Sequence, residues 1–110
     1  MRAADVSDWG TLVFEIMSQQ TPIARVQPIW LEWMERWPTP ADVAAASSAD
    51  IIVAWANLGY PSRALRVKAC AAAIVEKHDG EVPLSLKELT LLPGVGSYTA
   101  SALLAFRHGI

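Results

Sequence analysis

The sequence predicts an all-α fold, and three observations support this prediction. Apolar residues recur at intervals of three and four along most of the chain, which is the spacing of one face of an α-helix. Helix start and stop signals separate these stretches. No stretch of useful length alternates apolar and polar residues, as a half-buried strand would. We therefore expect one domain over residues 1–110, built from roughly six or seven short helices packed as a bundle.

Start signals of one kind open several of the expected helices. Each begins with a side-chain oxygen that can accept a bond from a first-turn N–H group, followed by a proline or an acidic residue in that turn. Such signals occur at Thr21-Pro22, at Thr39-Pro40, from Ser47 to Asp50 and from Ser85 to Glu88. The matching stop signals are Pro38, Gly59 and Asp79-Gly80.

The apolar faces between these signals place the expected helices. The first face consists of Trp9, Leu12, Val13 and Ile16. A long helix is expected from about Arg63 to His78, and its expected inward positions are Val67, Cys70, Ala71, Ile74 and Val75. The last helix is expected to run from Ser97 toward Arg107.

Composition limits the possible classes of protein. Hydrophobic residues make up 53% of the chain and charged residues 18%, yet no apolar run approaches the roughly 18 residues that span a bilayer. The first residues lack the apolar core of a signal peptide, so we expect a cytoplasmic protein that does not bind a membrane. Cys70 is the only cysteine and indicates a buried thiol rather than a disulfide or a metal site.

The most specific segment runs from Leu92 to Ala100 and contains the turn Pro93-Gly94-Val95-Gly96. It predicts two helices joined as a hairpin at about residues 85–107. Glycine permits positive φ and close approach, so the backbone N–H groups at the start of the second helix can bind a phosphate. This matters because the net charge is −2, whereas nucleic-acid-binding domains are usually basic. The alternative is an ordinary turn between helices with a glycine C-cap.

This segment resembles the helix-hairpin-helix motif of the base-excision DNA glycosylases. Two further segments are similar to the adenine-specific mismatch glycosylases of that superfamily: Glu15 to Thr21 resembles an E-x-M-x-Q-Q-T stretch, and Leu58 to Arg63 resembles an L-G-Y-Y-x-R loop, with Pro61 in place of the second tyrosine. The resemblance implies a partial catalytic domain with a helical bundle of the six-helix-barrel type. It also implies hydrolysis of the N-glycosidic bond of adenine opposite 8-oxoguanine or guanine in double-stranded DNA.

The resemblance assigns catalytic roles to Glu15 and Tyr98. Glu15 matches the family's catalytic acid, and a carboxyl in an apolar pocket suits that role. It lies off the apolar face of its helix, so periodicity alone is equally compatible with a solvated carboxylate. Tyr98 stands where the lyase members carry a nucleophilic lysine, which implies base removal without strand cleavage. Its alternative is a helix residue that packs in the core.

The resemblance assigns DNA contacts to seven residues: Gln19, Gln20, Tyr60, Arg63, Gly94, Val95 and Gly96. The two glutamines would probe the gap left by the flipped adenine, or simply be exposed polar residues. Tyr60 would be a wedge stacked beside the oxidised guanine, or a core residue. Arg63 would contact phosphate, or start its helix as a solvated charge.

The resemblance also implies features that these residues do not include. The family's essential aspartate, which stabilises the oxocarbenium ion, and the cysteines of its 4Fe–4S cluster are expected beyond Ile110, so we expect no cofactor or metal within the chain. The 110-residue chain alone is then expected to show little or no turnover, and to be a monomer if complete or to self-associate as a fragment. The alternatives are a thymine- or uracil-mismatch glycosylase and a non-catalytic DNA-binding remnant.

Overall fold

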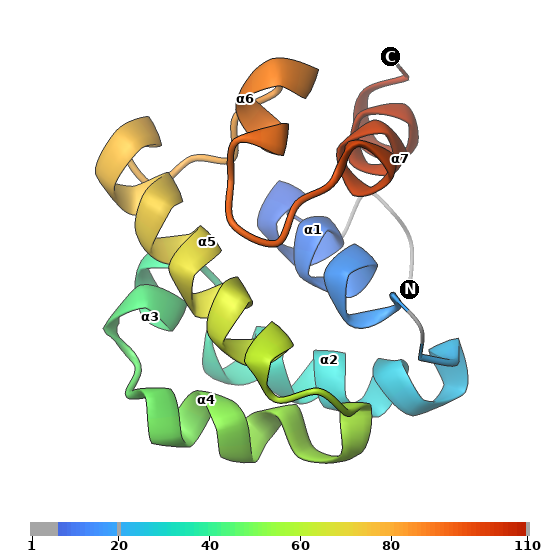
Figure 1. Cartoon of the computed structure of the whole chain (residues 1–110), viewed down its shortest axis with the longest axis vertical. Coiled ribbons are helices and arrows are strands. Elements are labelled where there is room, and N and C mark those ends of the chain that lie inside the picture. Colours follow the sequence, from blue (N-terminus) through green and yellow to red (C-terminus); the bar gives the residue numbers. More distant parts are fainter. Residues whose placement is uncertain (1–6, 20, 110) are drawn as a thin grey trace.

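A computed structural model of the chain describes residues 7–19 and 21–109, and all regular structure in these ranges is helical, which confirms the predicted fold class. Figure 1 shows the helices packed as a bundle, and their buried apolar side chains form a core cluster. The elements are α1 (Asp8–Met17), α2 (Ile23–Arg36), α3 (Pro40–Ala45), α4 (Ser48–Trp55), the short 3₁₀ helix η2 (Ala56–Leu58), α5 (Ser62–His78), α6 (Leu86–Thr90) and α7 (Ser97–His108).

Most of the predicted helix starts are found in the structure because they depend on neighbouring residues only. The Thr39 hydroxyl accepts a bond from the Asp42 N–H, and the Asp42 carboxylate accepts one from the Thr39 N–H, which completes a capping box. The Ser85 hydroxyl likewise accepts a bond from the Glu88 N–H and so caps α6. Thr21 was wrongly predicted to cap the second helix. Its hydroxyl donates instead to the distant Leu58 carbonyl, because tertiary packing overrides the local signal.

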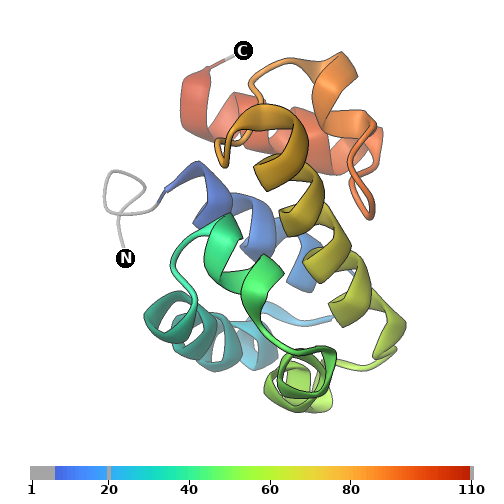
Figure 2. The ribbon, with the colours of Figure 1, turned by 90° about the vertical axis from the view of Figure 1, so that its left-hand side faces the viewer.

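The helices form two ends joined by a middle layer. Figure 2 shows α6 and α7 at one end and α2 and α4 at the other, with α1, α3 and α5 between them. The middle helices hold the ends together: α5 packs on α3 and α4, and α1 packs on both α2 and α7. The two helices at the ends of the chain therefore lie side by side although they are far apart in the sequence.

Tryptophans fill much of the core at the α2–α4 end. The Trp33 ring meets those of Trp37 and Trp55 edge to face at centroid distances of 5.1 and 5.9 Å. The indole N–H groups of Trp30 and Trp33 donate to the Gly10 and Ala54 carbonyls, so these large side chains are buried without loss of a hydrogen bond.

The long helix α5 differs from its prediction at one inward position. It has the expected length and buries Val67, Cys70, Ala71 and Ile74, but Val75 was wrongly predicted to face inward and is exposed. No helix within the described residues is long and apolar enough to cross a bilayer.

Candidate functional site

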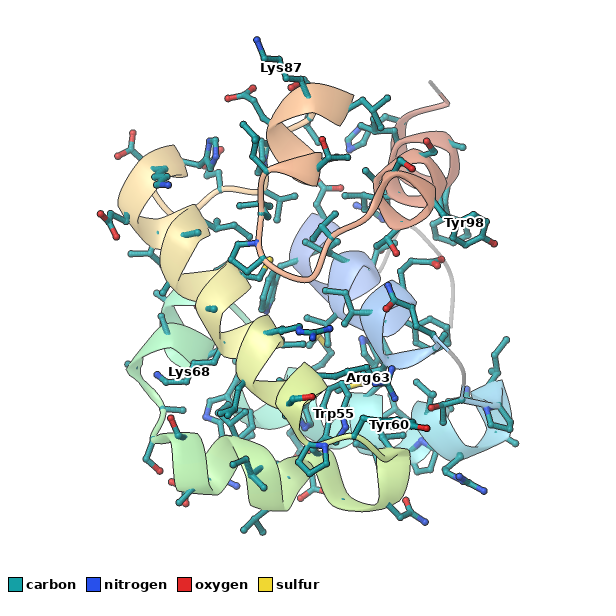
Figure 3. The ribbon with its side chains drawn as sticks, in the orientation of Figure 1. Trp55, Tyr60, Arg63, Lys68, Lys87 and Tyr98 are labelled. Atoms are coloured by element: carbon teal, nitrogen blue, oxygen red, sulfur yellow. The ribbon has the colours of Figure 1, made fainter. Side chains whose placement is uncertain are left out.

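Three segments carry the residues that the sequence singled out. They are the carboxy-terminal part of α1, the loop at residues 59–61 before α5, and the hairpin that leads into α7. Figure 3 shows Tyr60 and Tyr98 on the same side of the molecule, with Arg63 lying inward between α5 and α1. Lys68, further along α5, lies toward the opposite side.

Glu15 is half-buried near the end of α1. Among the described residues, its carboxylate has no hydrogen-bond donor or cation bonded to it. Burial disfavours the charged form and raises the pKa of Glu15 above its ordinary value of 4.5. A carboxyl shifted in this direction retains its proton at higher pH than a solvated one, which suits it to donate a proton to a leaving group.

Gln19 connects α1 to the start of α7. Its side-chain amide donates to the Thr99 hydroxyl at 2.7 Å, and Thr99 itself is buried. The contact joins residues 80 positions apart and fixes the end of α1 beside the first turn of α7. The predicted DNA contact of Gln19 remains a prediction, and Gln20 lies outside the described residues.

Tyr60 projects into solvent from a loop with a defined backbone. The side chain is 71% exposed, so the alternative of a core residue is wrong. Its φ of +52° lies in the left-handed region, which a bulky residue adopts only when its surroundings impose it. The neighbouring Gly59 carbonyl accepts a bond from the Trp55 indole N–H at 2.9 Å, and the Tyr60 carbonyl accepts one from the Arg63 N–H at 2.8 Å. An exposed aromatic ring held in this way is suited to stack against another flat group.

Arg63 differs from both of its predicted roles. It is 9% exposed, and its guanidinium donates to protein oxygens rather than facing solvent or a phosphate. The prediction of a phosphate contact or a solvated charge is therefore wrong. Burial lowers the pKa of Arg63, while Tyr60 opposes this shift, and an arginine remains charged in any case. The side chain belongs to the protein interior beneath the site.

Tyr98 and the hairpin form the remaining part of the site. Tyr98 is 80% exposed in the first turn of α7, so the alternative of a core residue is wrong here as well. The Gly96 N-cap offers no side chain to the first-turn N–H groups, which are left for an external acceptor. Gly94 has a φ of +79°, and its lack of a side chain leaves the backbone of the turn exposed. The buried Val95 side chain holds the turn against the core. This arrangement suits an anion, as expected from the sequence.

The described residues do not fit a metal or an iron–sulfur cluster. They include no group of three or more histidine, cysteine, aspartate or glutamate side chains that could hold a metal ion. The sulfur of Cys70 is buried in the core, and burial raises the pKa of this thiol to about 12. Cys70 therefore packs as a small apolar side chain of α5, as the sequence indicated.

The comparisons with known families bear directly on this arrangement. Residues 13–105 match the family described as HhH-GPD superfamily base excision DNA repair protein. The match includes Glu15, the Tyr60 loop, and the hairpin as far as residue 105 in α7. The chain belongs to the HhH-GPD superfamily.

Several HhH-GPD proteins are similar in sequence over almost the whole chain. An adenine DNA glycosylase of Mycobacterium tuberculosis is 51% identical over 107 residues, which cover 97% of this chain and 35% of the relative. The human adenine DNA glycosylase is 40% identical over 114 residues, covering 98% of this chain and 21% of the relative. A thymine/uracil-DNA glycosylase of Pyrobaculum aerophilum is 34% identical over 97 residues, covering 87% of this chain and 42% of the relative. The chain thus spans about a third of the length of the mycobacterial relative.

Solved HhH-GPD structures share the fold. A non-covalent endonuclease III–DNA complex superimposes with a TM-score of 0.89 at 28% identity, covering 94% of this chain and 49% of that one. A thermostable thymine-DNA glycosylase gives a TM-score of 0.88 at 25% identity, with coverage of 94% and 48%. The arrangement of α1, α5 and the hairpin is therefore that of known DNA glycosylases.

Three residues of the site were not identified as such from the sequence. Thr99 binds Gln19, Thr21 binds both Leu58 and Arg63, and Trp55 holds the Gly59 carbonyl. Their partners lie between 4 and 80 positions away. Thr21 and Thr99 both lie within segments that match the family, which was the only signal for them, and Thr21 was instead predicted to cap a helix.

Proposed function

We propose that this chain provides the acid-bearing helix, the aromatic loop and the DNA-binding hairpin of a monofunctional adenine DNA glycosylase. The substrate is double-stranded DNA in which adenine is mispaired with 8-oxoguanine or guanine. The enzyme hydrolyses the bond between the adenine and its sugar and leaves the strand intact. The observation that carries the proposal is the 51% identity to an adenine DNA glycosylase over 97% of the chain, which includes every candidate site residue.

The geometry supports a division of roles. Glu15, whose pKa is raised by burial, donates a proton to a ring nitrogen of adenine and makes the base a better leaving group. Tyr98 is exposed, so its hydroxyl is free to contact a flipped nucleotide, and a tyrosine cannot form the Schiff base of a lyase. The first-turn N–H groups of α7, which no side chain caps, bind a phosphate and hold the DNA without a lysine.

The decisive experiment measures adenine release from a duplex containing one adenine opposite 8-oxoguanine. The complete gene product that contains these residues should release adenine, and the strand should break only after treatment with alkali. Glu15→Gln should reduce the single-turnover rate by a factor of about 10² or more, because it removes the proton donor. Strand cleavage without alkali, or full activity of the Glu15→Gln variant, would contradict the proposal.

The 110-residue chain on its own provides a second arm of this experiment. The resemblance assigns the family's aspartate to none of these residues, so we expect the isolated chain to bind the duplex weakly and release little adenine. Rapid adenine release by the isolated chain would mean that the oxocarbenium ion is stabilised by a residue that the resemblance does not identify.

A thymine- or uracil-mismatch glycosylase is the second candidate. The 34% identity to the thymine/uracil-DNA glycosylase and the superposition on a thymine-DNA glycosylase favour it. The same gene product tested on a thymine mispaired with guanine distinguishes the two candidates, since faster release of thymine than of adenine would support this second function. A non-catalytic DNA-binding protein would bind the duplex in a salt-sensitive manner, release neither base, and be unaffected by Glu15→Gln.

A further inference from the structure

Arg63 is the only charged side chain that is buried among the described residues. Within these residues it has no carboxylate partner. A buried charge of this kind is tolerated only when hydrogen bonds replace its hydration. The hydrogen-bond acceptors around Arg63 therefore indicate its role.

The two terminal nitrogens of Arg63 bind two different parts of the site. Nη1 donates to the carbonyl oxygens of Ile16 and Gln19 at 3.1 and 2.7 Å. These carbonyls lie at the carboxy-terminal end of α1, where the helix dipole is negative and favours a cation. Ile16 adjoins Glu15, so this half of the fork holds the acid-bearing helix.

The second nitrogen holds the loop that carries Tyr60. Nη2 donates to the Leu58 carbonyl and to the Thr21 hydroxyl, both at 3.1 Å. The Thr21 hydroxyl itself donates to the Leu58 carbonyl at 3.2 Å, which closes a small network. Leu58 lies two residues before Tyr60. The guanidinium carbon of Arg63 also lies 5.2 Å from the centre of the Trp55 ring, and the N–H of that ring donates to the carbonyl of Gly59, between Leu58 and Tyr60.

We propose that Arg63 is a positioning residue that couples the end of α1 to the Tyr60 loop, so that the acid and the exposed aromatic ring meet the DNA in a fixed relation. The assignment of roles to Glu15 and Tyr60 rests on the proposed function, whereas the coupling itself does not. Arginine is required because its planar fork presents donors in two directions at once, and lysine offers a single point of charge.

Arg63→Lys tests the coupling, and Lys68→Met is a matched control. Lys68 also lies on α5 and also donates to a helix-end carbonyl, that of Ala44 at 2.7 Å, but at the opposite side of the bundle. Amide hydrogen exchange of the complete gene product is measured for each variant. In Arg63→Lys, protection should fall about tenfold in both residues 16–19 and residues 57–60, because one side chain holds both segments. In Lys68→Met, protection should fall near Ala44 only.

Duplex discrimination provides the functional readout. It is the ratio of the dissociation constants for a fully paired duplex and for one with adenine opposite 8-oxoguanine. Arg63→Lys should lower this ratio about tenfold. Lys68→Met should leave the ratio within about twofold of the wild-type value, even when this variant has as low a Tm as Arg63→Lys. A general loss of stability would lower the ratio in both variants, so this comparison separates positioning from stability.

The two readouts decide different questions. Loss of protection in only one segment, or unchanged discrimination in a folded Arg63→Lys variant, overturns the coupling. A wild-type protein that binds both duplexes equally contradicts the proposed function, and the exchange result then still decides the coupling. If Arg63→Lys does not fold, Thr21→Val removes the hydroxyl of the same network and should produce the same joint loss of protection.

Discussion

The half-buried Glu15 carboxylate has no hydrogen-bond donor bonded to it among the described residues, and its burial makes the stability of the fold depend on pH. Its pKa is raised in the folded chain by burial, whereas the unfolded value is the ordinary 4.5. The folded state therefore binds more protons between these two values, and stability falls as pH rises through this window. Above the folded pKa the unfavourable contribution is fully present, and below pH 4.5 it is absent.

Glu15→Gln should consequently stabilise the chain at pH 7 and have no such effect at pH 4. The gain is expected to be about 0.5 kcal/mol or less, because a half-exposed carboxylate remains partly screened by water. Urea unfolding at the two pH values measures the difference between variant and wild type. Glu35→Gln, which removes an exposed carboxylate of α2, controls for the change in net charge. If Glu15→Gln gains no more stability over the wild type at pH 7 than at pH 4, burial does not penalise the charged form of Glu15.

Single residues also show where prediction from the sequence reached its limit. The motif around Glu15 indicated a carboxyl in a pocket, whereas periodicity was equally compatible with a solvated carboxylate. Periodicity could not decide because the half-burial of Glu15 depends on how the helices pack. Arg63 was predicted to contact phosphate or water because its acceptors lie as many as 47 positions away and have no signature along the chain. Tyr60 is exposed, which excludes the core alternative, while its role as a wedge stays a prediction that only the matching loop indicated.

At the scale of elements, local signals predicted most of the helices. Thr39 and Ser85 cap the helices they were expected to cap, since a cap needs only the residues of the next turn. Thr21 carried the same kind of signal, yet its hydroxyl is used by Leu58 and Arg63. The Thr21-Pro22 signal still marks the start of α2 at Ile23, but the cap bond itself is lost because the Thr21 hydroxyl is buried between segments.

The hairpin before α7 is the element on which DNA binding depends, and Gly94 sets its geometry. A Cβ at this position would meet the Arg66 Cβ of α5 at 3.3 Å, and the φ of +79° is unfavourable for alanine. Gly94→Ala should destabilise the chain by about 1–2 kcal/mol and weaken duplex binding, because both the backbone and α5 must shift.

Gly96→Ala is the matched control within the same turn. A Cβ at Gly96 meets nothing within 4 Å, and its φ of −89° is ordinary for alanine. This variant should lose only a few tenths to about 1 kcal/mol as an N-cap. Thermal unfolding of both variants measures the difference, and equal losses of stability would mean that close packing against α5 does not determine the turn.

At the scale of the whole molecule, the ends of the described chain are joined by charge as well as by packing. The Asp8 carboxylate accepts a bond from Arg107 Nε at 3.1 Å and lies 3.0 Å from His108 Nε2. Asp8 lies in the first turn of α1 and Arg107 lies in the last turn of α7, so each of these charges also favours its own helix end. The contact joins the start of α1 to the end of α7, whereas the bond between Gln19 and Thr99 joins the other ends of the same two helices.

Asp8→Asn should destabilise the domain by about 1 kcal/mol, since these partners are largely shielded from water and bonded at short distance. Asp50→Asn removes a similar first-turn aspartate of α4 whose partner, Arg36, is exposed at 3.6 Å, and it should change stability by only a few tenths of a kcal/mol. Urea unfolding at low and high salt measures both variants, and part of the Asp8 effect should persist at high salt because buried pairs are less screened. If the two variants lose equal stability at both salt concentrations, the Asp8 ion pair does not contribute to the contact between α1 and α7. A loss specific to Asp8 would instead mean that charge helps to hold the acid-bearing helix against the hairpin helix.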